Sequence, residues 1–177
     1  MKFTEQNIEG VYLIEPDPYK DERGMLRRHF CQKEFSDFGL MTEIKQTNIS
    51  ENKKKHTLRG FHYQYPPHGE NKVISCIKGS IYDIVVDLRE ASETYLKWQH
   101  FELTEENRLS IYVPIGCANA YLTLNDNTWI LYYHSEFYTL RDEGSIRYND
   151  PLFKFQWHTE PAVISEKDLS IPDWRHK

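Results

Sequence analysis

The sequence predicts an all-β fold, an antiparallel sandwich or jelly roll with little helix. Short segments rich in β-branched and aromatic residues recur along the chain, and clusters of Gly, Pro, Asn and Asp separate them. Aromatic residues make up 14% of the chain, which suits strand interiors. At 177 residues the chain has the length of one ordinary domain with a substantial core. We therefore expect a single domain over residues 1–177.

The N-terminal part contains the first expected elements. Residues 11–15 are β-prone, and prolines end the segment. Residues 21–24, Asp-Glu-Arg-Gly, predict a turn that leads into an extended segment at residues 25–30. Residues 33–39 predict one short peripheral helix, which Gly39 stops at its C-terminal side.

The middle of the chain predicts most of the strands. Residues 81–88 lack clean alternation, as expected for a strand covered on both sides, and Asp83 and Asp87 within it are expected to find partners inside or at the rim of a barrel. After Tyr138 the chain becomes irregular, and this tail is expected to pack back over the barrel. Further strands are expected at residues 72–77, 98–103, 109–113, 117–124 and 128–134, with turn signals between them.

Composition excludes several classes of protein. The net charge of −5 argues against nucleic acid as a main partner, because such proteins need a basic face. The longest apolar runs are too short for a transmembrane helix, and the N-terminal residues lack the apolar core of a signal peptide. The three cysteines form no CxxC pair and fit reduced thiols. The sequence thus predicts a cytoplasmic protein.

The densest polar chemistry surrounds a segment centred on His62. As an extended strand, this segment places Arg59 and Phe61 on one side and His62 and Gln64 on the other, unless Gly60 introduces a bulge. A lone internal histidine is more often a structural residue than a functional one. The charged and polar residues that lie close to it in sequence favour a function.

Residues 59–64, Arg-Gly-Phe-His-Tyr-Gln, are followed by two prolines and Lys72. This pattern resembles the dTDP-4-dehydrorhamnose 3,5-epimerase family of sugar-nucleotide epimerases, and the resemblance runs from about Gly10 to Asp173. It implies a cupin-type jelly-roll barrel, usually a homodimer, with the N-terminal strands in the dimer interface. It also implies an isomerase that inverts C3 and/or C5 of a nucleoside-diphosphate 4-keto-6-deoxy sugar. Such enzymes serve deoxysugar biosynthesis for surface polysaccharide or glycosylated metabolites.

The chemistry needs groups on both faces of the sugar. A ketone at C4 acidifies the protons at C3 and C5, so inversion requires a base, a stabiliser for the enolate oxygen, and an acid on the opposite face. The resemblance makes His62 the base and Asp168 the carboxylate that orients its imidazole. It makes Lys72 the group facing the oxyanion and Tyr132 the acid. Two structural alternatives stay open: Tyr132 as plain core, and Asp168 as part of a capping box that begins at Ser165.

The resemblance also implies substrate-binding residues. Arg59, together with Arg23 from the same or a partner subunit, would bind the pyrophosphate, because forked donors match phosphate. Gln46 and Asn48 share one face of their strand and would contact sugar or nucleotide. Tyr138 would line the pocket.

One residue departs from the family. The family has Pro-x-Gly-x-Ala followed by His-Gly-Phe, whereas residues 114–118 are followed here by Asn119, Ala120 and Tyr121. An amide at this pocket position forms hydrogen bonds but cannot titrate. Two alternatives therefore stay open: a single-centre epimerase acting on a nucleotide other than dTDP, and a non-catalytic sugar-nucleotide-binding cupin.

A metal-dependent cupin is the rival within the same fold. Such proteins resemble one another in supplying three His and one Glu to the metal. Here His62 is present, but Gln64 and Asn119 stand where two further His would be. One imidazole among amides, with His68 and Glu70 nearby, makes a poor transition-metal site. Phosphate-binding glycine loops are also missing from the sequence, so we expect neither metal nor cofactor.

Overall fold

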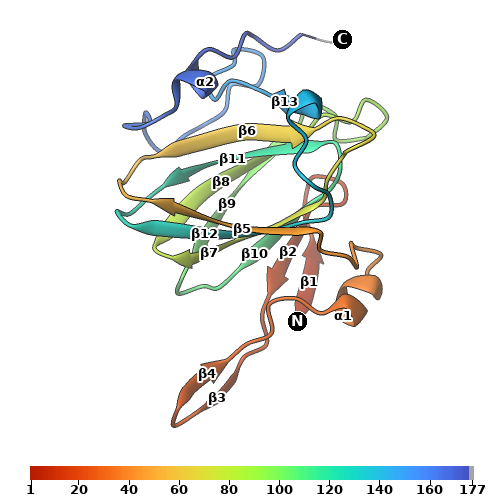
Figure 1. The fold of residues 1–177 in the computed structure, drawn as a ribbon, viewed down its shortest axis with the longest axis vertical. Coiled ribbons are helices and arrows are strands. Elements are labelled where there is room, and N and C mark those ends of the chain that lie inside the picture. The colour runs from red at the N-terminus through yellow and green to blue at the C-terminus, as the bar shows by residue number, and fades with distance from the viewer. Residues whose placement is uncertain (176–177) are drawn as a thin grey trace.

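The computed structural model describes residues 1–175 and consists mainly of two antiparallel sheets that face each other (Figure 1). Residues 176–177, the end of the expected domain, lie outside the described part. The predicted all-β class is confirmed. In spatial order the six-stranded sheet comprises β1 (Lys2–Glu5), β2 (Tyr12–Glu15), β10 (Ser110–Val113), β7 (Lys72–Lys78), β12 (Thr128–His134) and β5 (Gln46–Asn52). The five-stranded sheet comprises β13 (Glu143–Ser145), β6 (Leu58–Gln64), β11 (Cys117–Thr123), β8 (Ser80–Asp87) and β9 (Trp98–Thr104).

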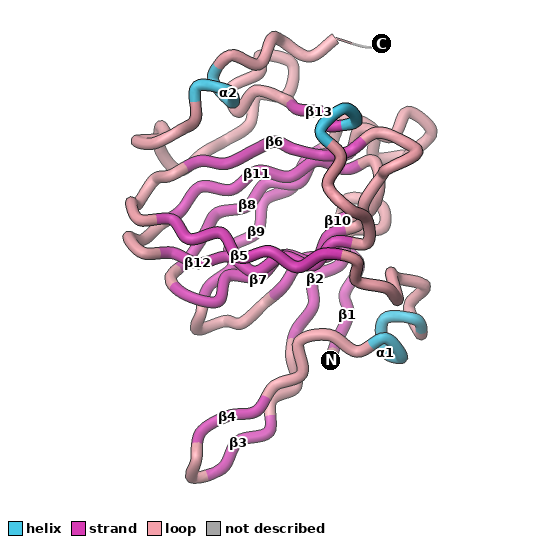
Figure 2. The backbone as a smooth tube through the Cα atoms, viewed as in Figure 1, coloured by secondary structure: helices cyan, strands magenta, loops and turns pink. Residues whose placement is uncertain are grey.

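The remaining elements are short. A hairpin of β3 (Tyr19–Asp21) and β4 (Gly24–Leu26) projects away from the two sheets (Figures 1 and 2). The sequence predicts an extended segment at residues 25–30, but the strand observed there, β4, ends at Leu26. Within residues 1–175, no helix has both the length and the apolar character needed to cross a membrane. The helices are α1 (Gln32–Ser36), the 3₁₀ helix η1 (Leu140–Asp142) and α2 (Glu166–Leu169).

Helix α1 is shorter than the sequence predicts. It ends at Ser36, and the amide of Leu40 turns back to donate to the carbonyl of Phe35. Gly39 adopts a φ of +69°, a left-handed conformation that glycine enters without steric cost. Gly39 has the left-handed conformation expected after a helix, but the helix itself ends three residues earlier, at Ser36.

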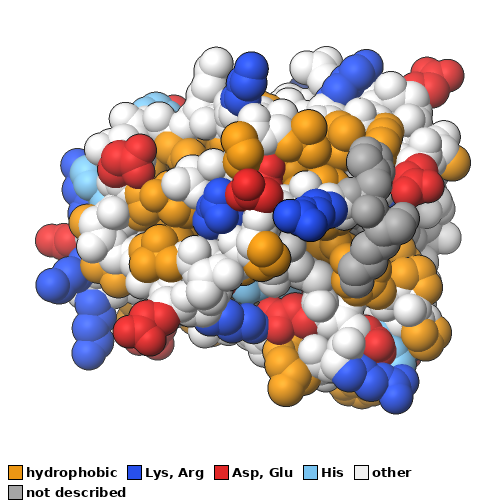
Figure 3. All heavy atoms as spheres, turned by 90° about the horizontal axis from the view of Figure 1, so that it is seen from above, with side chains coloured by type: hydrophobic (Ala, Val, Ile, Leu, Met, Phe, Trp, Pro, Cys, Tyr) orange, Lys and Arg blue, Asp and Glu red, His pale blue; other side chains and the backbone are white. Residues whose placement is uncertain are grey.

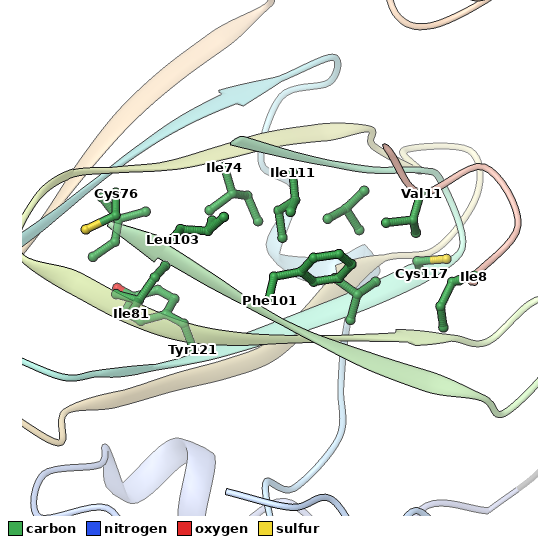
Figure 4. Close-up of a cluster of buried hydrophobic side chains, with 13 residues drawn as sticks. Ile8, Val11, Ile74, Cys76, Ile81, Phe101, Leu103, Ile111, Cys117 and Tyr121 are labelled. Atoms are coloured by element: carbon green, nitrogen blue, oxygen red, sulfur yellow. The ribbon is translucent and has the colours of Figure 1, made fainter. Parts of the chain in front are cut away.

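The main core lies between the two sheets (Figure 4). Ile74 and Ile111 from the six-stranded sheet pack with Ile81 and Leu103 from the other, and all four are fully buried. Burying each such side chain contributes roughly 1.5–3 kcal/mol. Strand β12 buries Ile130 in this core. Tyr132 and His134, which follow on the same face of the strand, carry polar groups.

The C-terminal segment covers the outer face of the five-stranded sheet. The rings of Phe61 and Phe155 stack with centroids 4.3 Å apart, and Trp174 packs into the same apolar cluster. The amide of Leu58 donates to the carbonyl of Val163 at 2.8 Å, which fixes the segment beside β6. Figure 3, which looks down on this face, shows apolar side chains among charged ones. The arrangement places α2 next to β6.

Asp87 anchors the loop that follows β8. Its carboxylate accepts hydrogen bonds from Arg89, Ser92 and Thr94, and Arg89 also donates to the carbonyl of Glu9. Burial by itself would raise the pKa of Asp87, but these hydrogen bonds outweigh burial and lower the pKa to about 2. The carboxylate thus ties the N-terminal segment to the five-stranded sheet.

We expect this anchor to be lost in acid. The pKa of Asp87 falls from an ordinary 3.8 to about 2 on folding, a difference worth roughly 2.5 kcal/mol. Because the folded pKa is the lower one, the stabilisation is complete above roughly pH 5 and disappears as the pH falls toward 2. Urea unfolding of the wild type and of Asp87→Asn at pH 7 and at pH 3 measures this stabilisation as the difference between their free energies of unfolding. The gap in unfolding free energy should narrow in acid, and a gap independent of pH would contradict the assignment.

Candidate active site

A cavity of about 570 Å³ lies between β6 and β11 of one sheet and β5 and β12 of the other. This is the volume typical of a pocket that binds a small molecule. It brings together residues that are far apart in sequence. Seven of the ten predicted site residues line it: Asn48, Arg59, His62, Lys72, Asn119, Tyr132 and Asp168.

A bulge at Gly60 decides which residues of β6 face the cavity. Between Arg59 and His62, β6 takes three steps where its partner β11 takes two. Gly60 has a φ of +111°, and a Cβ there would lie 2.5 Å from the carbonyl oxygen of Asn119. The extra residue turns Arg59 to the same side as His62, while Phe61 points into the outer apolar cluster. The prediction that Arg59 and His62 point to opposite sides of a regular strand is therefore wrong. The alternative prediction, a bulge at Gly60, is confirmed.

Carboxylates lie beside both ring nitrogens of His62. Nε2 is 3.1 Å from Asp168 Oδ1, and Nδ1 is 3.1 Å from Glu143 Oε1. Burial would raise the pKa of Asp168, but the hydrogen bond and charge of His62 lower it overall, so the group is a carboxylate. The Asp168 amide also donates to Ser165 Oγ at 3.0 Å. Asp168 therefore belongs to the cap of α2 and also contacts His62.

Lys72 is buried beside the same histidine. Its Nζ donates to the backbone carbonyl of His62 at 3.0 Å and lies 3.2 Å from Glu70 Oε1. The side chains of Lys72 and Glu70 are 8% and 9% exposed. An ammonium held this deeply interacts strongly with charge that develops in the cavity, because little water screens it.

Tyr132 comes from the opposite sheet. It packs against the main core and also lines the cavity, so core packing and a site role coexist. Burial, followed by the neighbouring Tyr121, raises the pKa of Tyr132 well above its usual value. The side chain is therefore a protonated phenol at neutral pH. Because His62 lies on β6 and Tyr132 on β12, the imidazole and the phenol come from different sheets and lie on opposite walls of the cavity.

Asn119 is fixed by a buried carboxyl group. Its Nδ2 donates to Asp83 Oδ2 at 3.1 Å. Burial raises the pKa of Asp83 well above its usual range, although the hydrogen bond from Asn119 and the charge of Lys72 oppose this. One of the two N–H groups of Asn119 is therefore used, and its second N–H group and its carbonyl oxygen are left for a ligand.

Three predicted binding residues do not line the cavity. The Gln46 side chain accepts a hydrogen bond from the amide of Tyr138, and the Tyr138 hydroxyl donates to Glu143. Both therefore adjoin the site. Arg23 is different: it lies in the projecting hairpin, pairs with Asp21 there, and has a side chain that is 82% exposed.

Gln64 has a structural use at the position where a metal-binding cupin would have histidine. Its amide nitrogen donates to the carbonyls of His68 and Phe137, and its oxygen accepts from the amide of Thr139. These bonds hold the chain that leaves β12. Among residues 1–175 no group of three His, Cys, Asp or Glu side chains is placed to hold a metal ion. Metal-free chemistry stays a prediction.

Glu143 and His134 are among the cavity residues that sequence reasoning missed. Glu143 lies in the irregular region after Tyr138, where no periodic pattern signals a strand. His134 had a usable signal, since it follows Tyr132 by two residues on the same strand and therefore shares its face.

Comparison with known proteins shows which family has this fold. The family model described as dTDP-4-dehydrorhamnose 3,5-epimerase matches residues 5–176. The dTDP-4-dehydrorhamnose 3,5-epimerase of Methanothermobacter thermautotrophicus is 35% identical over 171 residues, covering 94% of this chain and 91% of that protein. The crystal structure of the epimerase of the same name from Elizabethkingia anophelis NUHP1 superposes with a TM-score of 0.93 at 37% identity, covering 98% of this chain and 96% of that one.

A further similar structure is that of ChmJ, a 3'-monoepimerase from Streptomyces bikiniensis in complex with dTDP-quinovose. It superposes with a TM-score of 0.88 at 29% identity, covering 95% of this chain and 85% of that one. The matches extend over nearly the whole chain, and they confirm the predicted cupin-type jelly roll and the isomerase class. The chain belongs to the dTDP-4-dehydrorhamnose 3,5-epimerase family, whose members are epimerases of deoxysugar biosynthesis.

Proposed function

We propose that this protein epimerises a dTDP-linked 4-keto-6-deoxy sugar at C3, C5 or both, without a metal, in the cytoplasm. The observation that carries the proposal is the placement of His62 and Tyr132 on opposite walls of one cavity, with Lys72 beside the histidine. Inversion needs this arrangement, because the proton must leave one face of the sugar and return to the other. The names of the similar proteins, dTDP-4-dehydrorhamnose 3,5-epimerases, support dTDP as the nucleotide.

The proposed reaction has two proton transfers. His62 takes the proton from the carbon next to the ketone, and the electron pair of the broken C–H bond moves into an enolate whose negative charge lies on the C4 oxygen. The Lys72 ammonium stabilises that oxygen. Tyr132 then donates its phenolic proton to the carbon from the opposite face, the ketone re-forms, and solvent protons restore both side chains.

Glu143 has a role in the first transfer. With Nε2 of His62 directed at Asp168, the abstracted proton arrives on Nδ1, which is 3.1 Å from Glu143. The imidazolium that forms then has a carboxylate within 3.1 Å of each ring nitrogen. The hydrogen bond to Asp168 and the negative charge of Glu143 both favour the charged state after abstraction, so they lower the barrier to forming it.

We further propose a homodimer in which the β3–β4 hairpin carries Arg23 to the partner's cavity. Tyr19 and Leu26 on this hairpin are 65% and 75% exposed, and such apolar surface commonly marks an interface. Strand β5 is the outer strand of its sheet and exposes Ile49 by 55%, which leaves a strand edge available next to the cavity.

The dimer makes a measurable prediction. Light scattering should give twice the chain mass, and Arg23→Ala should weaken dTDP binding by roughly 10- to 100-fold, because a charge-assisted contact to phosphate is lost. Arg28→Ala is the matched control, since Arg28 is also exposed and, like Arg23, pairs with a nearby carboxylate, that of Glu34. A monomeric mass, or equal dTDP affinity in both variants, would contradict the arrangement.

Asn119 bears on how many centres are inverted. A titratable imidazole at this position could carry a positive charge, whereas the amide here directs one N–H group at Asp83 and can form only neutral hydrogen bonds with the sugar. Enolate formation continues, because His62 and Lys72 remain. The sugar, however, seats differently, and a misplacement of about 1 Å can reduce a rate by ~10²-fold.

We therefore expect fast exchange at one centre and slow or absent exchange at the other. Mass spectrometry of a dTDP-4-keto-6-deoxy sugar incubated with the enzyme in D₂O should show uptake of one deuteron well before a second. Asn119→His should accelerate the second uptake. Rapid uptake of two deuterons by the wild type would show that the amide is a neutral replacement, and no uptake at all would refute the proposed function.

A further inference from the structure

His134, a residue that lines the cavity, forms a second imidazole–carboxylate pair that the proposed mechanism does not use. His134 Nδ1 lies 2.8 Å from Glu70 Oε2, and the other oxygen of Glu70 lies 3.2 Å from Lys72. The His134 side chain is 12% exposed and lines the cavity. Its ring also stacks on that of Tyr132, with centroids 5.7 Å apart. The imidazole is therefore held firmly at a wall of the proposed substrate site.

The contacts determine what His134 offers to a ligand. Burial would raise the pKa of Glu70, but the hydrogen bond of His134 and the charge of Lys72 lower it overall, so Glu70 is a carboxylate and can only accept. Nδ1 must therefore carry a proton. In the neutral ring Nε2 is then an acceptor, and the Asn48 amide, 3.4 Å away, makes only a long contact with it.

The position of this acceptor relative to Lys72 indicates which part of a substrate it meets. His134 and Lys72 are directly paired across β12 and β7. In the proposed function, on which this step rests, Lys72 faces the oxygen on C4. A group beside Lys72 then meets a substituent of a neighbouring carbon, which is a hydroxyl at C3 or a hydrogen and methyl group at C5. A nitrogen lone pair matches the hydroxyl, because the methyl group cannot donate.

We propose that His134 is a specificity-determining residue that accepts a hydrogen bond from the C3 hydroxyl of the sugar through Nε2. Glu70 fixes the tautomer and orientation that make this acceptor available. The pair selects sugars that carry a hydroxyl next to the ketone over 3-deoxy sugars, because a bound sugar without that hydroxyl leaves a partly buried nitrogen poorly paired.

Two substitutions separate this role from a structural one. His134→Asn keeps a side-chain donor for Glu70 but has no atom at the Nε2 position, whereas His134→Phe keeps the stacked ring and loses both nitrogens. Calorimetry in a His62→Ala background, which prevents turnover, measures binding of three ligands. These are the dTDP-4-keto-6-deoxy sugar, its 3-deoxy analogue, and dTDP alone.

We expect both variants to bind the 3-hydroxy sugar roughly 10-fold more weakly than the parent, with less than about twofold change for the other two ligands. A loss confined to His134→Phe would show that the imidazole only supports Glu70 and Lys72, and would overturn the proposal. An equal loss for all three ligands, or no loss, would also overturn it. Failure of the proposed function itself is seen separately, as absence of deuterium exchange by the wild type.

Discussion

Replacing His62 with alanine should reduce deuterium incorporation into a dTDP-4-keto-6-deoxy sugar by at least ~10²–10⁴-fold, the usual contribution of general-base catalysis. The reason is specific to the site, since His62 contacts Asp168 and Glu143 and lines the cavity from β6. Removing the imidazole leaves the cavity without the base assigned to the C–H proton. Binding of dTDP should change little, because the phosphate contacts are assigned to Arg59 and Arg23. Mass spectrometry in D₂O measures exchange, and calorimetry measures binding.

The chain offers a matched control for this experiment. His68 also has a carboxylate partner, Asp142 Oδ2 at 2.6 Å from Nδ1, and its side chain is 29% exposed compared with 32% for His62. It does not line the cavity. His68→Ala should therefore exchange deuterium at nearly the wild-type rate. Appreciable exchange by His62→Ala, or comparable losses in both variants, would remove His62 from the role of base.

Replacing Lys72 with methionine should have two large effects at once. Turnover should fall by roughly 10²–10³-fold, because a preorganised cation at the developing enolate oxygen is lost. Stability should fall by about 3 kcal/mol, because the buried Glu70 carboxylate loses its ammonium partner and keeps only His134. Methionine is unbranched and only one atom shorter than lysine, so packing is largely preserved. Deuterium exchange and urea unfolding measure the two effects separately.

Two further variants separate catalysis from stability. Lys45→Met breaks an ion pair of similar length, 2.7 Å to Glu136, in which the lysine side chain is 30% exposed. That change should reduce stability far less than Lys72→Met, because water screens the charges. Adding Glu70→Gln to Lys72→Met removes the stranded carboxylate and should restore much of the stability but not the exchange rate. Recovery of exchange in the double variant would show that Lys72 acts only through folding.

The sequence by itself determined the class of fold and most of the site. Alternating β-prone segments and turn residues predicted the strands of both sheets from residue 72 to residue 134, because side-chain size and backbone preference act locally. The ordered match around His62 and Lys72 predicted the family, which the comparisons confirm. Asn119 was identified as the departure from the family by sequence alone, since it occupies a defined position in a motif.

Only the tertiary structure decided which of these residues meet. The bulge at Gly60 turns Arg59 into the cavity, and it depends on how closely the backbone of β11 approaches β6. Arg23 lies on a hairpin remote from the cavity of its own chain, a position that local pattern leaves open. The His134–Glu70–Lys72 cluster forms because β12 and β7 pair in one register. Spacing along a strand fixes the direction of a side chain, but contact between strands depends on register and on the loops that carry charged groups back to the sheet.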